Sequence, residues 1–320
     1  MSRLIDNIAD FLVENGFELS FQIRHDFDVI VTRTLDGRHT KVILPLEISA
    51  GTIEEAEAES ENAEYAIRMI TREAGYPLII TEDRWRSQRQ MMEARLLAHL
   101  ELFSQAYARN CEVRRIEKAE AQEFLNRNHS YGDAACKYRY GLFLKRHTGH
   151  IAAEMGFPIG SGMTDEVKNL SEGTLIAVAT FSNARRWIKE GKEIRSYEWT
   201  RYASLPDLRV SGGMGKMLKA FIKEVQPDDI MSYADLEWSE GEVYERLGFE
   251  AETRKEPVTF TIDPQTWERT AIRRSPVKPG MTEEKPGMTE GDNVIPDLIG
   301  DLFFRNFGSR KFRLKLTDYK

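Results

Sequence analysis

The strongest candidates for a binding site form a glycine-rich turn. The turn consists of Arg209, Val210, Ser211, Gly212, Gly213, Met214, Gly215 and Lys216. Apolar residues recur at helical spacing directly after the turn, so a helix is expected to start there. A helix start carries unpaired backbone N–H groups and a positive dipole end, and glycines let a phosphate approach that backbone closely. The turn therefore predicts an anion-binding site, with a plain tight turn as the alternative. It lacks the Gly-Lys-Ser/Thr ending of an ATP-binding loop, which disfavours phosphoryl transfer.

A second group of residues follows the turn. Ser232 to Asp235 end an expected strand, and the segment from Gly241 to Phe249 carries Tyr244 just ahead of a Leu-Gly-Phe sequence. With the glycine turn, this order resembles the GNAT acetyltransferase superfamily over residues 111 to 262. The resemblance implies that residues 209 to 216 bind the pyrophosphate of acetyl-CoA or another acyl-CoA, and that Tyr244 protonates the departing thiolate. The family opens the turn with Gln or Arg, whereas this chain has Val210 beside Arg209. Packing of Tyr244 beneath a sheet is the alternative.

A narrower resemblance rests on additional segments. Residues 128 to 131 read Asn-His-Ser-Tyr and residues 198 to 201 read Glu-Trp-Thr-Arg. With the glycine turn, residues 232 to 235 and residues 244 to 249, they resemble GNAT-fold proteins of phages and mobile elements, including relatives of the Mom DNA-modification enzymes. The implied acceptor is an amine on a nucleobase in DNA. Asp235 and His129 would then orient a nucleophile or serve as a base. Capping of the next helix by Asp235 and a structural loop role for His129 are the alternatives.

A local group of cations is the expected contact for nucleic acid in a chain whose net charge is −7. It contains Arg185 and Arg186, with Lys189, Lys192 and Arg195 close in sequence. Arg201 and Trp199 are expected on one face of a strand, where they would contact a phosphate and stack on a base. A solvated hairpin tip would explain the cations equally well, and core packing is the favoured role for Trp199.

The first third of the chain predicts a helix over residues 4 to 12, strands over 18 to 23, 27 to 34 and 41 to 48, a helix from Thr52 to about Ala74, a strand over 76 to 81 and a helix over 83 to 103. This order predicts a mixed sheet and resembles the restriction-endonuclease-like core. The resemblance makes Asp28 and Glu47 weak candidates for metal ligands. Ser49 stands where that family has Lys, so an inactive DNA-binding or structural domain is expected rather than a nuclease.

The pattern then restarts, with strands expected over 111 to 116, 138 to 144, 174 to 181 and 193 to 201, and a helix over 118 to 127. After the turn follow a helix over 215 to 225, a strand over 230 to 234, a helix over 240 to 247, and strands over 249 to 253 and 257 to 262. Residues 147 to 169 are expected to form a surface loop. The segment Lys-Pro-Gly-Met-Thr-Glu occurs at 278 to 283 and again at 285 to 290, which predicts a disordered tail.

These elements predict an α/β (α+β) protein with a restriction-endonuclease-like domain over residues 1 to 108, a GNAT-like acyltransferase domain over 109 to 273 and a low-complexity tail over 274 to 320. Cys111 and Cys136 fit neither a disulfide framework nor a zinc site. The chain lacks an apolar run long enough to span a membrane and a cleavable leader, so no membrane contact and a cytoplasmic location are expected.

The first functional hypothesis is an acyl-CoA-dependent N-acyltransferase that takes a CoA thioester and acts on DNA. The second is a DNA-binding or nuclease protein of a mobile element with a non-catalytic GNAT fold. The acceptor, the acyl group and the oligomeric state are left open.

Overall fold

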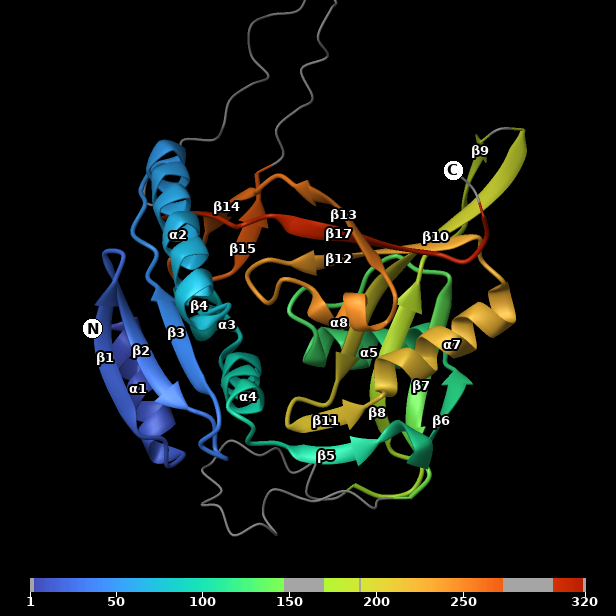
Figure 1. Cartoon of the computed structure of the whole chain (residues 1–320), viewed down its shortest axis with the longest axis horizontal. Helices are drawn as coiled ribbons and strands as arrows, with labels where there is room; N and C mark the ends of the chain where they lie inside the picture. The colour runs from blue at the N-terminus through green and yellow to red at the C-terminus, as the bar shows by residue number, and fades with distance from the viewer. Residues whose placement is uncertain (1–2, 147–169, 190, 273–301, 319–320) are drawn as a thin grey trace, which may run out of the picture.

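The structure is a computed structural model that describes residues 3–146, 170–189, 191–272 and 302–318. It contains helices and mixed sheets, which confirms the predicted α/β class. A smaller sheet built from the first third of the chain lies beside a larger sheet built from the remainder (Figure 1). The expected loop at 147 to 169 and the repeated hexapeptide lie outside the described residues.

The smaller sheet contains β1 (Leu19–Arg24), β2 (Phe27–Arg33), β3 (Thr40–Leu46) and β4 (Leu78–Thr81) in that order, with β3 and β4 parallel. Strand residues alternate between two helices. Ile30 and Ile43 pack against α1 (Leu4–Glu14), and Val29 and Val42 pack towards α2 (Ile53–Ala74). The predicted cap of α2 is confirmed, because the Thr52 hydroxyl accepts a hydrogen bond from the backbone N–H of the third helical residue at 3.2 Å. The predicted order of elements is confirmed for residues 4 to 81.

The single helix predicted over residues 83 to 103 is wrong. The segment forms two helices, α3 (Glu82–Ser87) and α4 (Arg89–His99), because Gln88 leaves helical geometry with φ −130° and ψ 40°. The chain then enters a short strand, β5 (Ser104–Tyr107), and a single 3-10 turn, η1 (Ala108–Asn110). Strand β5 pairs in parallel with β11 (Leu208–Ser211), the segment that leads into the glycine turn. Backbone hydrogen bonds thus join the two parts of the chain directly beside residue 108, the expected domain boundary.

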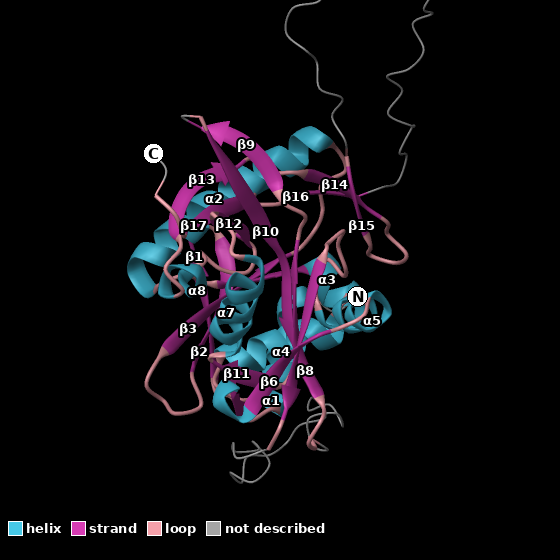
Figure 2. Ribbon diagram, turned by 90° about the vertical axis from the view of Figure 1, so that its right-hand side faces the viewer, coloured by secondary structure: helices cyan, strands magenta, loops and turns pink. Residues whose placement is uncertain are grey.

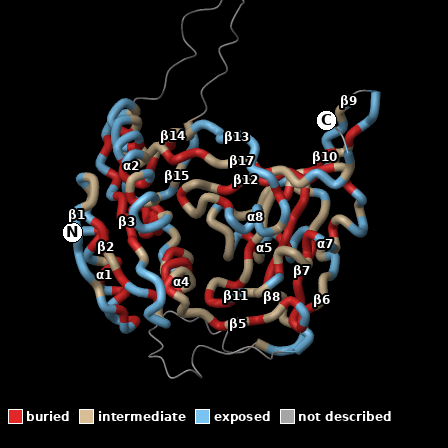
Figure 3. Tube along the Cα trace, in the orientation of Figure 1, coloured by how far each residue is buried: buried red, intermediate tan, exposed pale blue. Residues whose placement is uncertain are grey.

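The larger sheet has the order β13-β17-β12-β10-β8-β7-β6. In chain order its members are β6 (Cys111–Arg115), β7 (Tyr138–Leu144), β8 (Leu175–Phe181), β10 (Lys192–Ser204), β12 (Asp229–Asp235), β13 (Glu250–Lys255) and β17 (Ser309–Lys315). Neighbouring strands are antiparallel except for β10 and β12. One face is covered by α5 (Lys118–Asn128) and the opposite face by α7 (Gly213–Val225) and α8 (Glu242–Arg246), as Figure 2 shows for α5 and α7. Strand β8 is buried along nearly its whole length (Figure 3).

The disordered tail predicted beyond residue 273 is wrong over residues 302 to 315. Strand β17 inserts between β12 and β13, and its central residue Phe312 is fully buried. Strand β16 (Leu302–Arg305) joins β14 (Thr259–Ile262), which also pairs with β15 (Arg269–Ala271). The strands after the repeat supply hydrogen bonds and apolar contacts that the interior of the sheet needs, so the part of the chain that forms the larger sheet does not end at residue 273.

Candidate functional site

The two parallel strands of the larger sheet separate soon after they meet. Strands β10 and β12 pair only from Ser196 with Asp229 to Glu198 with Met231. Beyond Glu198, β10 pairs with β8, while β12 continues to pair with β17 on its other side. A register shift between Trp199 and Arg201 marks a bulge in β10 at the point where the strands part. Bulges re-aim side chains and end strand pairing next to active sites.

Tyr244 lies at this point of separation. The Ser232 hydroxyl on β12 bonds to the Trp199 carbonyl on β10 at 3.0 Å and to the Tyr244 hydroxyl at 2.9 Å. The Tyr244 ring is partly buried against Trp199, Phe249 and Phe312. Burial raises the pKa of Tyr244, and the bond to Ser232 only partly opposes this. The Tyr244 hydroxyl therefore keeps its proton at neutral pH and can supply it to a neighbouring anion.

The glycine turn begins α7 as predicted. Gly212 is exposed and left-handed, with φ +76°, and the first intrahelical bond runs from the Lys216 N–H to the Gly212 carbonyl at 3.0 Å. The N–H groups of Gly213, Met214 and Gly215 precede that bond and belong to the unpaired first turn. Gly213 is buried, and a Cβ there would lie 3.0 Å from both the Tyr202 hydroxyl and Val210. The open part of the turn is thus Gly212 and the residues that follow Gly213.

Residues 103 to 111, here called the linker, join the two parts of the chain and contact several side chains of the turn. The Lys216 ammonium donates to the carbonyls of Ala108 at 2.7 Å and Cys111 at 2.5 Å. Ser211 accepts a hydrogen bond from Gln105 at 3.1 Å, and Arg209 lies over the Phe103 ring. These three side chains are directed to the linker. The anion-binding capacity of the turn consequently rests on its backbone N–H groups and on the charge of Lys216.

Tyr131 contacts both His129 and Asp235, one at each end of the residue. The Tyr131 hydroxyl donates to Asp235 at 2.8 Å, and the Tyr131 N–H donates to His129 Nδ1 at 3.1 Å. This assigns the imidazole proton to Nε2 when the ring is neutral. Burial, with the charges of Arg201 and Arg84, lowers the pKa of His129 to about 4. Tyr244 does not join this group, because it bonds Ser232, whereas Asp235 projects from the opposite face of β12.

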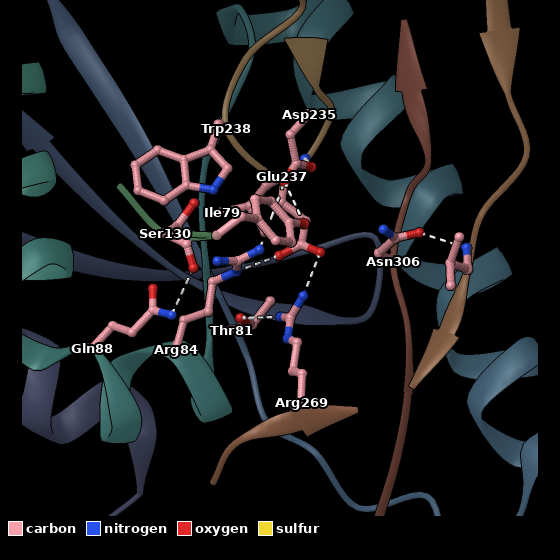
Figure 4. Close-up of polar contacts among 12 residues, drawn as sticks. Ile79, Thr81, Arg84, Gln88, Ser130, Asp235, Glu237, Trp238, Arg269 and Asn306 are labelled. Atoms are coloured by element: carbon pink, nitrogen blue, oxygen red, sulfur yellow. Dashed lines mark hydrogen bonds and ion pairs between the residues drawn. The ribbon is translucent and has the colours of Figure 1, made fainter. Parts of the chain in front are cut away.

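Asp235 belongs to a buried ionic cluster, here called the network, that contains Asp83, Arg84, Arg95, Asp235, Glu237 and Arg269. Figure 4 shows Glu237 between Arg84 and Arg269, which contact its two carboxylate oxygens at 2.9 and 2.7 Å. Arg269 also pairs with Asp83, and Arg84 lies 3.6 Å from Asp235. The three guanidinium groups and three carboxylates balance in charge, so the network binds the first third of the chain to the loop after β12.

The network explains the electrostatics of its acids. Burial alone would raise the pKa of Glu237, but Arg269 and Arg84 outweigh it and hold that pKa at about 2. Burial raises the pKa of Asp235, and the neighbouring Glu237 charge adds to the effect. The sequence did not predict that Arg84, Arg95, Glu237 and Arg269 act as a unit. The available signal was the alternation of charged and apolar residues beside buried strands, which also occurs on ordinary solvated surfaces.

The residues expected to contact nucleic acid separate into two places. Arg185 and Arg186 lie on β9 (Arg185–Lys189), with side chains 70% and 67% exposed. The prediction that Trp199 and Arg201 share a face is wrong. Trp199 packs with Phe181 on the α7 face, whereas Arg201 donates to the Gly132 carbonyl at 3.0 Å, because the bulge between them reverses the alternation. Trp199 is only 3% exposed and is therefore a core residue.

The weak metal candidates of the first third line one cavity of about 320 Å³. Asp28 pairs with Arg3 at 2.6 Å, and Glu47 accepts the Leu4 N–H at 3.1 Å at the start of α1. Ser49 lines the same cavity and donates to Glu59 at 2.8 Å. In the described parts of the chain, no group of three or more His, Cys, Asp or Glu residues is arranged to hold a metal ion. Asp28 and Glu47 are instead engaged by Arg3 and the α1 backbone.

Comparison with known proteins adds no functional assignment. No family model matches the chain, and no curated protein matches it. Among solved structures, a chain described under "The crystal structure of KacTA-DNA complex" is similar at 17% identity, with 45% of this chain and 86% of that chain covered and a TM-score of 0.26. A TM-score this low does not establish a common fold. No helix within the described ranges combines the length and apolarity needed to cross a membrane.

Proposed function

We propose that this protein is a GNAT-fold N-acyltransferase that binds an acyl-CoA where β10 and β12 separate. The observation that carries the proposal is the position of the Tyr244 hydroxyl at the parting of the only parallel strand pair within the described part of the larger sheet. The carboxyl ends of parallel strands, followed by a glycine turn and a helix start, are the usual place for a phosphate-bearing ligand. The order of strands, glycine turn and helices supports the GNAT resemblance that the sequence suggested.

The residues of the chain divide the proposed chemistry between them. The first-turn N–H groups of α7 and the Lys216 charge attract the diphosphate. The bound thioester supplies an activated acyl carbonyl, and attack by the acceptor amine forms the new C–N bond and breaks the C–S bond. The departing sulfur takes the proton that Tyr244 holds, and the amine loses its extra proton to solvent or to a base. Burial keeps Tyr244 in its protonated form, so its hydroxyl carries a proton when the thiolate leaves.

The acceptor proposed is an amine on a nucleobase in DNA. His129, in its neutral form, and Asp235 are still predicted to orient this amine. The contacts of Asp235 with Tyr131 and its place in the network also fit a purely structural role. A second candidate function is a DNA-binding protein whose GNAT fold does no chemistry. The capture of Lys216, Arg209 and Ser211 by the linker favours this candidate, because those side chains are not directed at a ligand.

The two candidates differ in their response to acetyl-CoA. Free ligand at about a hundred times its dissociation constant stabilises the folded protein by about 2.7 kcal/mol. We expect acetyl-CoA to raise the thermal midpoint of the parent protein, and we expect Gly215→Asp to lose this response. Position 215 is preferable to Gly213, because a Cβ at Gly215 meets only the flexible end of Leu247 at 3.3 Å. A carboxylate in the first turn favours the helix while repelling a diphosphate.

The matched control is Gly215→Asn, which has nearly the same shape without the charge and should retain most of the acetyl-CoA response. Both variants are compared by calorimetric titration with acetyl-CoA. Equal affinity of the Asp and Asn variants would place the diphosphate elsewhere. No binding to the parent protein would leave the non-catalytic DNA-binding function as the better description.

A further inference from the structure

Strand β9 and the first part of β10 form a two-stranded ribbon that projects from the larger sheet (Figure 1). Residues 185 to 196 include five cations and two carboxylates, Glu190 and Glu193, for a net charge of +3. The whole chain has a net charge of −7, so this ribbon is a local reversal of sign. Its three arginines pair with carboxylates, and the ribbon still carries an excess of positive charge.

The pairing register within the ribbon places like charges directly opposite one another. Lys192 faces Lys189, and Arg195 faces Arg186. Directly opposed like charges destabilise an antiparallel pair. Glu193 and Asp228 lie 3.3 and 3.7 Å from the two arginines and offset the second pair. Lys189 and Lys192 are therefore directly opposed at the outer end of the described part of the ribbon.

The cations occupy both faces of the ribbon. Opposed residues in an antiparallel pair share a face, and successive pairs alternate, so Lys189 and Lys192 project from the face opposite to Arg186 and Arg195. Arg185 lies on the lysine face together with the partly exposed Trp187. A flat anionic surface can neutralise only one face of a ribbon. A groove with a phosphate backbone on each side can neutralise both.

We infer that the β9–β10 ribbon is a DNA-binding arm that enters a groove of a duplex. The major groove of B-DNA admits a two-stranded β-ribbon, and the lysine pair and arginine pair would then contact the phosphates of its two walls. Ile188, 77% exposed beside Arg186, and Trp187 supply apolar atoms for contact inside the groove. This inference does not require the glycine turn to bind acyl-CoA, because the ribbon uses none of the residues of the turn.

The test is the salt dependence of duplex binding, measured by fluorescence anisotropy with a labelled DNA duplex and the full chain. Each phosphate contact contributes about −0.9 to the slope of log K against log salt. The double variant K189Q/K192Q should therefore have a slope less negative by about 1.8 than the parent. Between about 50 and 200 mM salt, the variant should lose about twelvefold less affinity than the parent. Removing the opposed lysine pair should leave the thermal midpoint unchanged or slightly higher.

The matched control is K118Q/K145Q, which removes two exposed lysines far from the ribbon in sequence and should leave the slope unchanged. The single variant Lys189→Glu keeps the ribbon intact, because it creates an opposite-charge pair with Lys192, and should also weaken binding. Equal slopes for K189Q/K192Q and the control would overturn the inference. Tighter binding to single strands or to anionic vesicles than to the duplex would overturn it as well. The acetyl-CoA response of K189Q/K192Q should match the parent, and Gly215→Asp should retain duplex binding, so this inference and the transferase proposal fail separately.

Discussion

Replacing Glu237 with Gln is expected to destabilise the folded protein at the junction between the two parts of the chain. The Glu237 side chain is 2% exposed, and its two oxygens accept hydrogen bonds from Arg84 and Arg269, whose side chains are 5% and 9% exposed. Glutamine keeps one acceptor but turns its amide hydrogens towards the other arginine. The network would then hold three guanidinium groups against two carboxylates.

Two independent estimates give the size of the effect. Breaking a buried ion pair by removing one partner costs about 3–5 kcal/mol. The second estimate comes from the pKa of Glu237, which the arginines hold at about 2 instead of its ordinary 4.5. That difference corresponds to about 3 kcal/mol of stability. Because the folded pKa is depressed, this contribution is present above pH 4.5 and is lost as the pH falls towards 2.

The assay is urea unfolding at neutral pH and again at low pH, followed by tryptophan fluorescence. Trp238 is a suitable reporter, because its carbonyl accepts a hydrogen bond from Arg95 of the network at 3.0 Å. Glu242→Gln is the matched control, since Glu242 makes the same kind of pair with Arg246 at 2.8 Å on the surface of α8. An exposed pair of this kind contributes about 0.3–0.5 kcal/mol.

We expect Glu237→Gln to lower the free energy of unfolding by about 3 kcal/mol or more at neutral pH. The difference from the parent should shrink as the pH falls from 4.5 towards 2, where the parent loses the same contribution. A loss no larger than that of Glu242→Gln would show that the network is not a source of stability. A difference that does not change with pH would show that the pKa of Glu237 is not depressed.

Three further predictions follow from the site and the fold. Tyr244→Phe should leave acetyl-CoA binding intact and lower the release of free CoA thiol in the presence of DNA by about a hundredfold or more, and unchanged turnover would exclude Tyr244 as the general acid. Phe312→Ala should cost about 3–5 kcal/mol in urea unfolding, because the ring is fully buried beside Tyr244, whereas Phe21→Ala, at a side chain 61% exposed, should cost little; equal costs would contradict the placement of β17. The imidazole of His129 should titrate near pH 4 in NMR spectra rather than near 6.5, and a midpoint above 6 would contradict its burial beside Arg201 and Arg84.

The order of elements could be predicted from the sequence because it depends on local patterns. Period-two and helical spacing of apolar residues located the strands of the smaller sheet and most of those of the larger sheet, and the Thr52 cap and the glycine turn located two helix starts. The same reasoning failed at Gln88, where tertiary contacts break a continuous helical pattern into α3 and α4. Local propensity is weak enough for packing to override it.

Composition misled the interpretation of the C-terminal segment for a physical reason. Pro-Gly repeats predict irregular chain, and that expectation was extended to residues 302 to 315 beyond them. Those residues form strands because β12, β13 and β14 offer them unpaired edges. An edge supplied by residues far away in the chain leaves no trace in a local pattern.

The sequence by itself determined which residue types are available: a glycine turn before a helix, a tyrosine after a strand, and a cluster of cations. Only the tertiary structure decided how they combine. The parting of β10 and β12 brings Ser232 and Tyr244 together, the bulge at Trp199 separates it from Arg201, and the ribbon register opposes Lys189 with Lys192. Each of these outcomes depends on strand register and long-range pairing, which arise when distant segments compete to bury the same apolar surface.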